Sequence, residues 1–169
     1  AFANKCDACI APSKHLERML IEDGGLTVPC YVFPNGIDTK RYKKASAADS
    51  PIEKRPGEKF IISVARLSPE KRQRTLIEAM PHIRSKEVKL VLVGGGPYEE
   101  ELRQRVEELG VGDRVIFAGM RSGDEVAAML KQADVFSLAS YHFDNQPMTF
   151  LEAAASGLPI VYCDERMTE

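Results

Sequence analysis

The sequence predicts an α/β fold in which helices cover both faces of a doubly wound parallel sheet, after a short strand-helix-strand segment at the N-terminus. From residue 58 onward, short apolar runs alternate with longer amphipathic stretches. The apolar runs are nearly continuous and rich in β-branched residues, as in strands buried on both faces of a parallel sheet. Strands that alternate with helices indicate right-handed βαβ units and therefore a doubly wound, Rossmann-like sheet.

Five strands are expected in this part of the chain, over residues 60–65, 89–93, 115–118, 135–139 and 159–163. The helices between them are expected over residues 70–80, 98–109, 126–133 and 153–156. Residues that commonly begin or end helices support these assignments. Ser68 and Pro69 are suited to an N-cap and a first helical position, and Gly110 is suited to a helix end.

Two further helix starts are predicted from capping boxes, in which a hydroxyl and a carboxylate three residues later satisfy free amides. Ser122 and Glu125 form one candidate, and Thr149 and Glu152 form another. Gly157 and Pro159 then end the last helix.

The first 57 residues follow a different pattern. Residues 8–11, 14–21 and 31–33 are expected to form a strand, a helix and a strand, and Pro34-Asn35-Gly36 to form a turn. Residues 38–57 carry small, polar and basic residues, which favour a linker.

Composition excludes several classes of function. The formal net charge of −2 provides no basic field, so nucleic acid is not an expected partner. Neither a membrane-length apolar run nor a signal-peptide pattern is present in the sequence. Cys6 and Cys9 form a CxxC, which is compatible with a redox pair or half of a zinc site, but we favour small apolar residues in a strand. Free thiols without a secretion signal favour the cytoplasm.

Ligands of an open parallel sheet bind beyond the carboxyl ends of its strands, so the binding residues are expected in the loops there. Arg66 and Lys71 follow the first of the five strands and flank a predicted helix start. Cations are unfavourable near a helix N-terminus unless an anion joins them. A diphosphate would supply that anion, whereas two solvated surface charges would have no ligand.

Glycines follow the second strand, in Gly94-Gly95-Gly96-Pro97. Their spacing differs from a dinucleotide fingerprint, and there is no phosphate-loop lysine. We favour a tight turn into a helix, although glycines also let a substrate approach the backbone.

The loop after the fourth strand carries two carboxylates, Asp144 and Glu152, on either side of a predicted helix start. The amides near Met148 and Thr149 should point out of this helix start and are suited to a phosphate, with the carboxylates on the sugar hydroxyls. The alternative for Glu152 is the capping box with Thr149. His142 is a candidate base, but an incidental loop histidine is the favoured interpretation.

From about residue 8 to 164, the chain resembles the retaining GT-B glycosyltransferases called group 1. Four segments carry the resemblance, and their order and spacing make it specific. They are residues 34–38 (PNGID), 63–71 (SVARLSPEK), 93–97 (VGGGP) and 151–159 (LEAAASGLP).

The resemblance implies a donor site for a nucleotide-diphosphate sugar. Arg66 and Lys71 would hold the diphosphate, Glu152 the ribose, and Asp144 would lie near the donor sugar. The amides around Met148 and Thr149 would meet phosphate and sugar, and the backbone near Arg121 would meet the base. Asp144 and Glu152 are the two candidate catalytic residues.

Two residues depart from the family pattern in this loop. Asp144 stands where the family usually has a glutamate, and Pro147 where it often has a glycine. Proline also removes an amide donor, so the contacts to the sugar are the ones affected.

The resemblance also implies a domain division. Residues 1–37 would be a remnant of the N-terminal acceptor domain, 38–57 a linker, and 58–169 a nucleotide-sugar-binding domain truncated at its C-terminus. A fragment of this kind is expected to bind donor without turning over.

The expected reaction is transfer of a hexose, with retention, to a cell-envelope glycan or glycolipid. It would occur in the cytoplasm at the inner face of the membrane, which the absent part of the N-terminal domain would contact. We expect no metal and no cofactor. The alternatives are a sugar-nucleotide epimerase of the same architecture and a non-catalytic nucleotide-sugar-binding module.

Overall fold

A computed structural model describes residues 2–141, 144 and 146–164. Its main sheet has five parallel strands in the order β5-β4-β3-β6-β7, which confirms the predicted fold class. The chain runs outward from β3 to one edge and then returns to build the other half, as in a doubly wound sheet. The strands are β3 Lys59–Val64, β4 Val88–Val93, β5 Val115–Gly119, β6 Val135–Leu138 and β7 Ile160–Tyr162.

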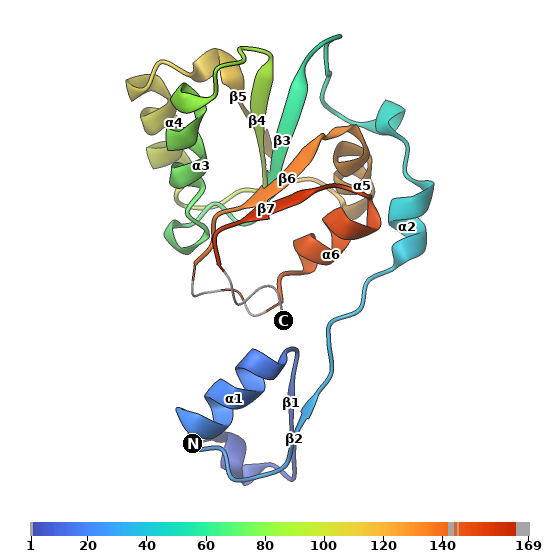
Figure 1. Ribbon diagram of the computed structural model, residues 1–169, viewed down its shortest axis with the longest axis vertical. Helices are drawn as coiled ribbons and strands as arrows, with labels where there is room; N and C mark the ends of the chain where they lie inside the picture. The colour runs from blue at the N-terminus through green and yellow to red at the C-terminus, as the bar shows by residue number, and fades with distance from the viewer. Residues whose placement is uncertain (1, 142–143, 145, 165–169) are drawn as a thin grey trace.

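Helices pack on both faces of this sheet (Figure 1). On β4, Leu90 and Leu92 face one core, while Val91 and Val93 face the other, because successive side chains of a strand alternate. The first core is shared with α3 Gln73–Ala79 and α4 Glu99–Glu108, and the second with α5 Gly123–Gln132 and α6 Met148–Ala155.

The N-terminal segment forms a separate small unit below the main sheet in Figure 1. Its strands β1 Cys9–Ala11 and β2 Cys30–Val32 pair in parallel and are joined by α1 Lys14–Glu22. This is the predicted strand-helix-strand order. Cys9 lies in β1 as expected, but Cys6 lies before the strand and is exposed.

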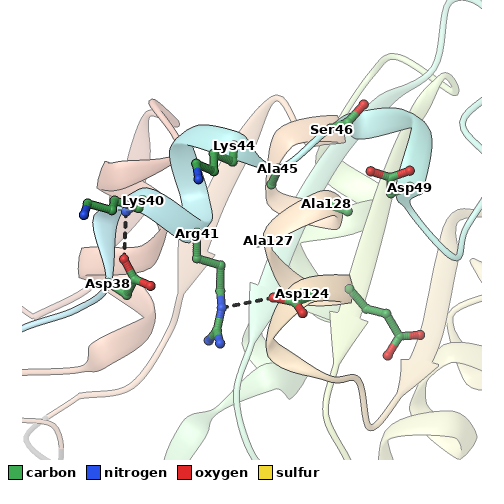
Figure 2. A pocket seen from close by; sticks show the side chains of 11 residues that line it. Asp38, Lys40, Arg41, Lys44, Ala45, Ser46, Asp49, Asp124, Ala127 and Ala128 are labelled. Atoms are coloured by element: carbon green, nitrogen blue, oxygen red, sulfur yellow. Dashed lines mark hydrogen bonds and ion pairs between the residues drawn. The ribbon is translucent and has the colours of Figure 1, made fainter.

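The segment predicted as a linker contains α2 Thr39–Lys44 and a 3-10 turn, η2 Ala47–Asp49, which pack against the main domain. Tyr42 of α2 is 4% exposed and belongs to the core beneath α5 and α6. Beside it, the Arg41 Nε atom lies 3.0 Å from Asp124 at the start of α5 (Figure 2). The sequence of α2 is mostly basic, so the single buried aromatic residue, Tyr42, did not indicate a packed helix.

Two of the predicted helix starts are wrong. Pro69–Lys71 forms a 3-10 turn, Arg72 adopts a left-handed conformation (φ 52°), and α3 begins only at Gln73. Ser68 does not cap the backbone, because its hydroxyl donates to the Glu70 carboxylate at 2.7 Å. Helix α6 begins at Met148, which places both Thr149 and Glu152 inside the helix and excludes their capping box.

Other local signals are confirmed. Ser122 and Glu125 form the predicted capping box of α5. Gly110 follows the end of α4 in the left-handed region (φ 62°), where glycine is favoured. Among the described residues, no helix combines the length and the apolar character needed to cross a membrane.

Candidate functional site

The candidate site lies where the strand order reverses, between β3 and β6. These strands pair in parallel, and the chain leaves β3 toward β4 on one side and enters β7 from β6 on the other. Their following loops therefore diverge and leave a crevice at the carboxyl edge, where α/β sheets bind their ligands. The loop after β3 carries Arg66 and Lys71, and the loop after β6 leads to α6.

The glycine loop after β4 is packed against the loop that carries Arg66. A Cβ atom on Gly94 or Gly96 would lie 2.1 Å from the carbonyl oxygen of Ala65 or Leu67, respectively. Leu67 N donates to Gly95 O at 3.0 Å, and Tyr98 N donates to Leu67 O at 3.2 Å. The glycines are thus required by the close approach of two loops, in agreement with the favoured turn.

Arg66 lines a pocket of about 440 Å³ at this edge of the sheet. Arg121 and Thr149 line the same pocket, so two loop residues and one residue in the first turn of α6, all predicted site residues, share one cavity. The backbone beneath Arg66 is held by Gln73, whose Nε2 atom donates to the Arg66 carbonyl at 2.7 Å. Gln73 is almost fully buried, which fixes this part of the loop.

Lys71 and Asp144 form an ion pair through the Lys71 ammonium and Asp144 Oδ1. Their side chains are 17% and 11% exposed, respectively. The second carboxylate oxygen, Asp144 Oδ2, is buried and has no hydrogen-bond partner among the described residues. The structure thus brings together two residues that the sequence places in different loops.

The start of α6 is not capped by a side chain, because Pro147 occupies the N-cap. The first intrahelical bond is donated by Phe150 N to Pro147 O, so the amides of Met148 and Thr149 precede it. Free amides at a helix start favour an anion. Thr149 faces the pocket, while Met148 and Glu152 do not line it.

Glu152 interacts instead with Tyr42 of α2. Burial raises the pKa of the Tyr42 hydroxyl to about 12, and the neighbouring Glu152 carboxylate adds to this increase through a hydrogen bond and its negative charge. The carboxylate is therefore held on the side of α6 that packs against α2.

The Arg121 guanidinium is turned back on its own loop and helix. Its Nε atom donates to Ala118 O at 2.8 Å, and Nη1 lies 3.2 Å from Glu125. The pKa of Glu125 is lowered, chiefly by hydrogen bonds from the Ser122 amide and hydroxyl and further by Arg121. The Arg121 side chain is thus engaged within the protein, and the predicted contact with the base concerns its backbone.

The predicted candidate base, His142, lies outside the described residues. In the described part of the chain, no cluster of three or more His, Cys, Asp or Glu side chains is arranged to hold a metal ion.

Three residues of functional interest were not identified from the sequence. Met120 lines the pocket and is 77% exposed. Its Cγ atom would lie 3.3 Å from a Cβ atom added to Gly95. Gln73 donates a hydrogen bond to the backbone carbonyl of Arg66, and Tyr42 interacts with the carboxylate of Glu152. A polar residue in an otherwise apolar helix stripe was a signal for Gln73, whereas nothing in the local sequence marked Met120.

The fold and the site together define a class: a doubly wound α/β domain with a pocket at the carboxyl edge of its parallel sheet. More specifically, the chain belongs to the family described as "Glycosyl transferases group 1", whose model matches residues 46–168.

Two similar proteins are bacterial enzymes that carry glycosyltransferase names. The chain is 32% identical over 169 residues to alpha-monoglucosyldiacylglycerol synthase of Streptococcus pneumoniae, with 95% of this chain and 38% of that protein covered. It is 39% identical over 139 residues to a GDP-mannose-dependent alpha-(1-6)-phosphatidylinositol monomannoside mannosyltransferase of Mycobacterium tuberculosis, with 76% and 36% covered. The chain thus spans well under half the length of these relatives.

Solved structures show the same architecture. HepE of Anabaena in complex with UDP-glucose matches with a TM-score of 0.83 and 27% identity, over 95% of this chain and 46% of that one. Sucrose-phosphate synthase of Thermosynechococcus elongatus matches with a TM-score of 0.81 and 25% identity, over 95% and 41%.

Proposed function

We propose that this chain is the donor-binding half of a glycosyltransferase that transfers a hexose from a nucleotide-diphosphate sugar to a cell-envelope glycan or glycolipid, with retention. The observation that carries the proposal is the convergence of Arg66, Arg121 and Thr149 on one pocket at the carboxyl edge of the sheet. Lys71 lies in the same loop as Arg66, although it does not line this pocket. Two relatives named for lipid acceptors support the acceptor class. HepE, which was solved with UDP-glucose, supports the donor class.

The protein's contribution to the reaction would be stabilisation of the leaving diphosphate. Negative charge develops on the diphosphate as its bond to the sugar breaks, and preorganised positive groups lower the energy of that state. Arg66, Lys71 and the uncapped start of α6 can supply this stabilisation without a metal ion. Metal independence therefore remains part of the proposal, and EDTA should leave donor affinity unchanged.

The remaining roles follow the family pattern. The amides of Met148 and Thr149 would meet phosphate and sugar, Glu152 the ribose, and the backbone near Arg121 the base. Asp144 would accept hydrogen bonds from sugar hydroxyls and favour positive charge at the sugar, as carboxylates do in glycosidases.

The acceptor side belongs to a domain of which residues 1–37 would be a remnant, with 38–57 joining it to the donor domain at 58–169. Membrane contact at the cytoplasmic face would come from the rest of that domain. The proposal therefore separates binding, which this chain can perform, from transfer, which needs the whole enzyme.

Calorimetric titration with UDP, GDP and ADP tests the donor site. At least one diphosphate should bind, and Arg66→Ala should weaken it at least tenfold, because charge-assisted contacts to phosphate are lost. Arg74→Ala is the matched control, since Arg74 pairs with Glu78 on the exposed side of α3. Failure of all three to bind would favour a non-catalytic interaction domain.

A further inference from the structure

We propose that Asp144 is a specificity-determining residue. It would make the proposed diphosphate site at Arg66 and Lys71 discriminate between a nucleotide sugar and the free nucleoside diphosphate. The inference rests on the proposed function and deepens it. It assigns Asp144 two alternative partners, the Lys71 ammonium when no sugar is bound and the donor sugar when it is present.

The ion pair between Lys71 and Asp144 is present before any ligand binds. Lys71 and Asp144 are both largely buried, and a buried charge that loses its partner is strongly destabilised. A diphosphate that binds Lys71 must therefore compete with Asp144 for the ammonium. It also brings further negative charge close to the Asp144 carboxylate, which is unfavourable.

The hydroxyl groups of a bound donor sugar would compensate this cost. Asp144 Oδ2 is buried and has no hydrogen-bond partner among the described residues, so the carboxylate has unused acceptor capacity. The hydroxyl groups of a donor sugar would satisfy both oxygens when Lys71 turns to the diphosphate. A free nucleoside diphosphate lacks the hydroxyls of the donor sugar, and its ribose is assigned to Glu152, so it leaves Asp144 uncompensated.

The fold also holds the two groups together. Lys71 is followed by Arg72, the one non-glycine residue with positive φ in the described part of the chain. The Arg72 guanidinium lies 5.9 Å from the centre of the Tyr141 ring, which adds a cation–π contact three residues before Asp144. Beyond Asp144, Gln146 Oε1 accepts a hydrogen bond from Asn35 N at 2.5 Å. The loop is thus anchored on both sides of the carboxylate.

This arrangement has a consequence for turnover. Once the sugar has been transferred, Asp144 loses its hydroxyl partners and competes again for Lys71. The nucleoside diphosphate left after transfer therefore binds more weakly than the donor did, and this promotes release of the diphosphate.

The inference is tested by calorimetric titration of the wild type and Asp144→Asn with UDP, GDP, ADP and the matching nucleotide sugars. Asp144→Asn should bind the free diphosphate about tenfold more tightly, because the competing charge is removed. The preference for nucleotide sugar over diphosphate should fall by a similar factor. A simple sugar-binding role would instead leave the affinity for the free diphosphate unchanged.

Two further variants make the result specific. In the Lys71→Met background, Asp144→Asn should no longer tighten diphosphate binding, because the competition acts through Lys71. Glu99→Gln removes the same charge from α4, where Glu99 is paired with Arg103, and it should change affinity less than twofold. Asp144→Ala removes the same charge with a different side chain and should also tighten diphosphate binding. Thermal unfolding of each variant shows whether it is folded.

The outcomes separate the two proposals. If a diphosphate binds and Arg66→Ala weakens it, but Asp144→Asn binds it equally or less tightly, the role of Asp144 is overturned and the donor site stands. If none of the diphosphates binds any variant, both proposals fail. Binding to the wild type that becomes about tenfold tighter in Asp144→Asn supports both proposals.

Discussion

Buried polar side chains in this protein hold neighbouring backbone segments together. Arg114 is almost fully buried, and its guanidinium donates to the carbonyls of Met80, Ser85 and Val88 at 2.9, 3.1 and 3.2 Å. Gln73 similarly holds the carbonyl of Arg66. An unsatisfied buried carbonyl costs about 1–3 kcal/mol, so single side chains of this kind decide the course of whole loops.

Asp134 makes a comparable connection, and its effect should depend on pH. Burial raises the pKa of its carboxyl, but hydrogen bonds from Lys54, the Phe60 amide and Lys59 outweigh burial and hold the pKa below its ordinary value of 3.8. A carboxyl with a depressed folded-state pKa stabilises the fold above its unfolded-state pKa, and this stability is lost as the pH falls through the folded-state value.

We therefore expect Asp134→Asn to lower the free energy of unfolding by about 1–3 kcal/mol at pH 7. Below about pH 4, the difference from the wild type should shrink, because the wild-type carboxyl becomes protonated as well. Urea unfolding at pH 7 and pH 3 measures both values. A difference that is equal at the two pH values would show that shape and not charge is responsible.

At the scale of elements, the stability of the donor site depends on the contact between the loops after β3 and β4. Gly96→Ala would place a Cβ atom 2.1 Å from the Leu67 carbonyl, and neither backbone can move without breaking the bond from Tyr98 N to Leu67 O. We expect a loss of about 2–4 kcal/mol in unfolding free energy, together with weaker diphosphate binding.

The control is Gly112→Ala, in the turn before β5, where the nearest atom to a new Cβ lies 4.0 Å away on Val106. This variant should remain within about 0.5 kcal/mol of the wild type. Denaturant unfolding of both variants decides the matter. Equal stabilities would mean that the glycine loop does not depend on its neighbour.

Sequence patterns predicted the strands of the main sheet well because each carries a continuous apolar run, which β3, β4 and β6 bury on both faces. Two helix starts were missed for a physical reason: tertiary contacts override local capping preferences. Ser68 is drawn to Glu70, and Arg72 adopts a left-handed conformation that separates the 3-10 turn from α3. Helix α2 was missed because one buried residue, Tyr42, anchors a segment whose composition is that of a linker.

At the scale of the whole molecule, the topology explains why part of the site was predictable. Loops after neighbouring parallel strands meet at one edge, so the convergence of Arg66, Arg121 and Thr149 follows from strand order. The pairing of Lys71 with Asp144 could not be predicted, because it depends on side-chain direction across residues 73 positions apart. The turn of Glu152 toward Tyr42 was hidden for the same reason, since α2 was not expected.

The division between binding and transfer gives the last prediction. A nucleoside diphosphate at 100 times its dissociation constant should stabilise this chain by about 2.7 kcal/mol. For a chain of this size, that corresponds to an increase of about 5–10 °C in Tm. The proposed ligand site exists only in the folded chain, so the shift should disappear in Arg66→Ala and persist in Arg74→Ala. Under the same conditions, a radiolabelled nucleotide sugar should give no transfer product with this chain, because the proposed acceptor domain is represented only by residues 1–37. Transfer by the chain itself would contradict the proposed domain division, even if the shift in Tm is observed.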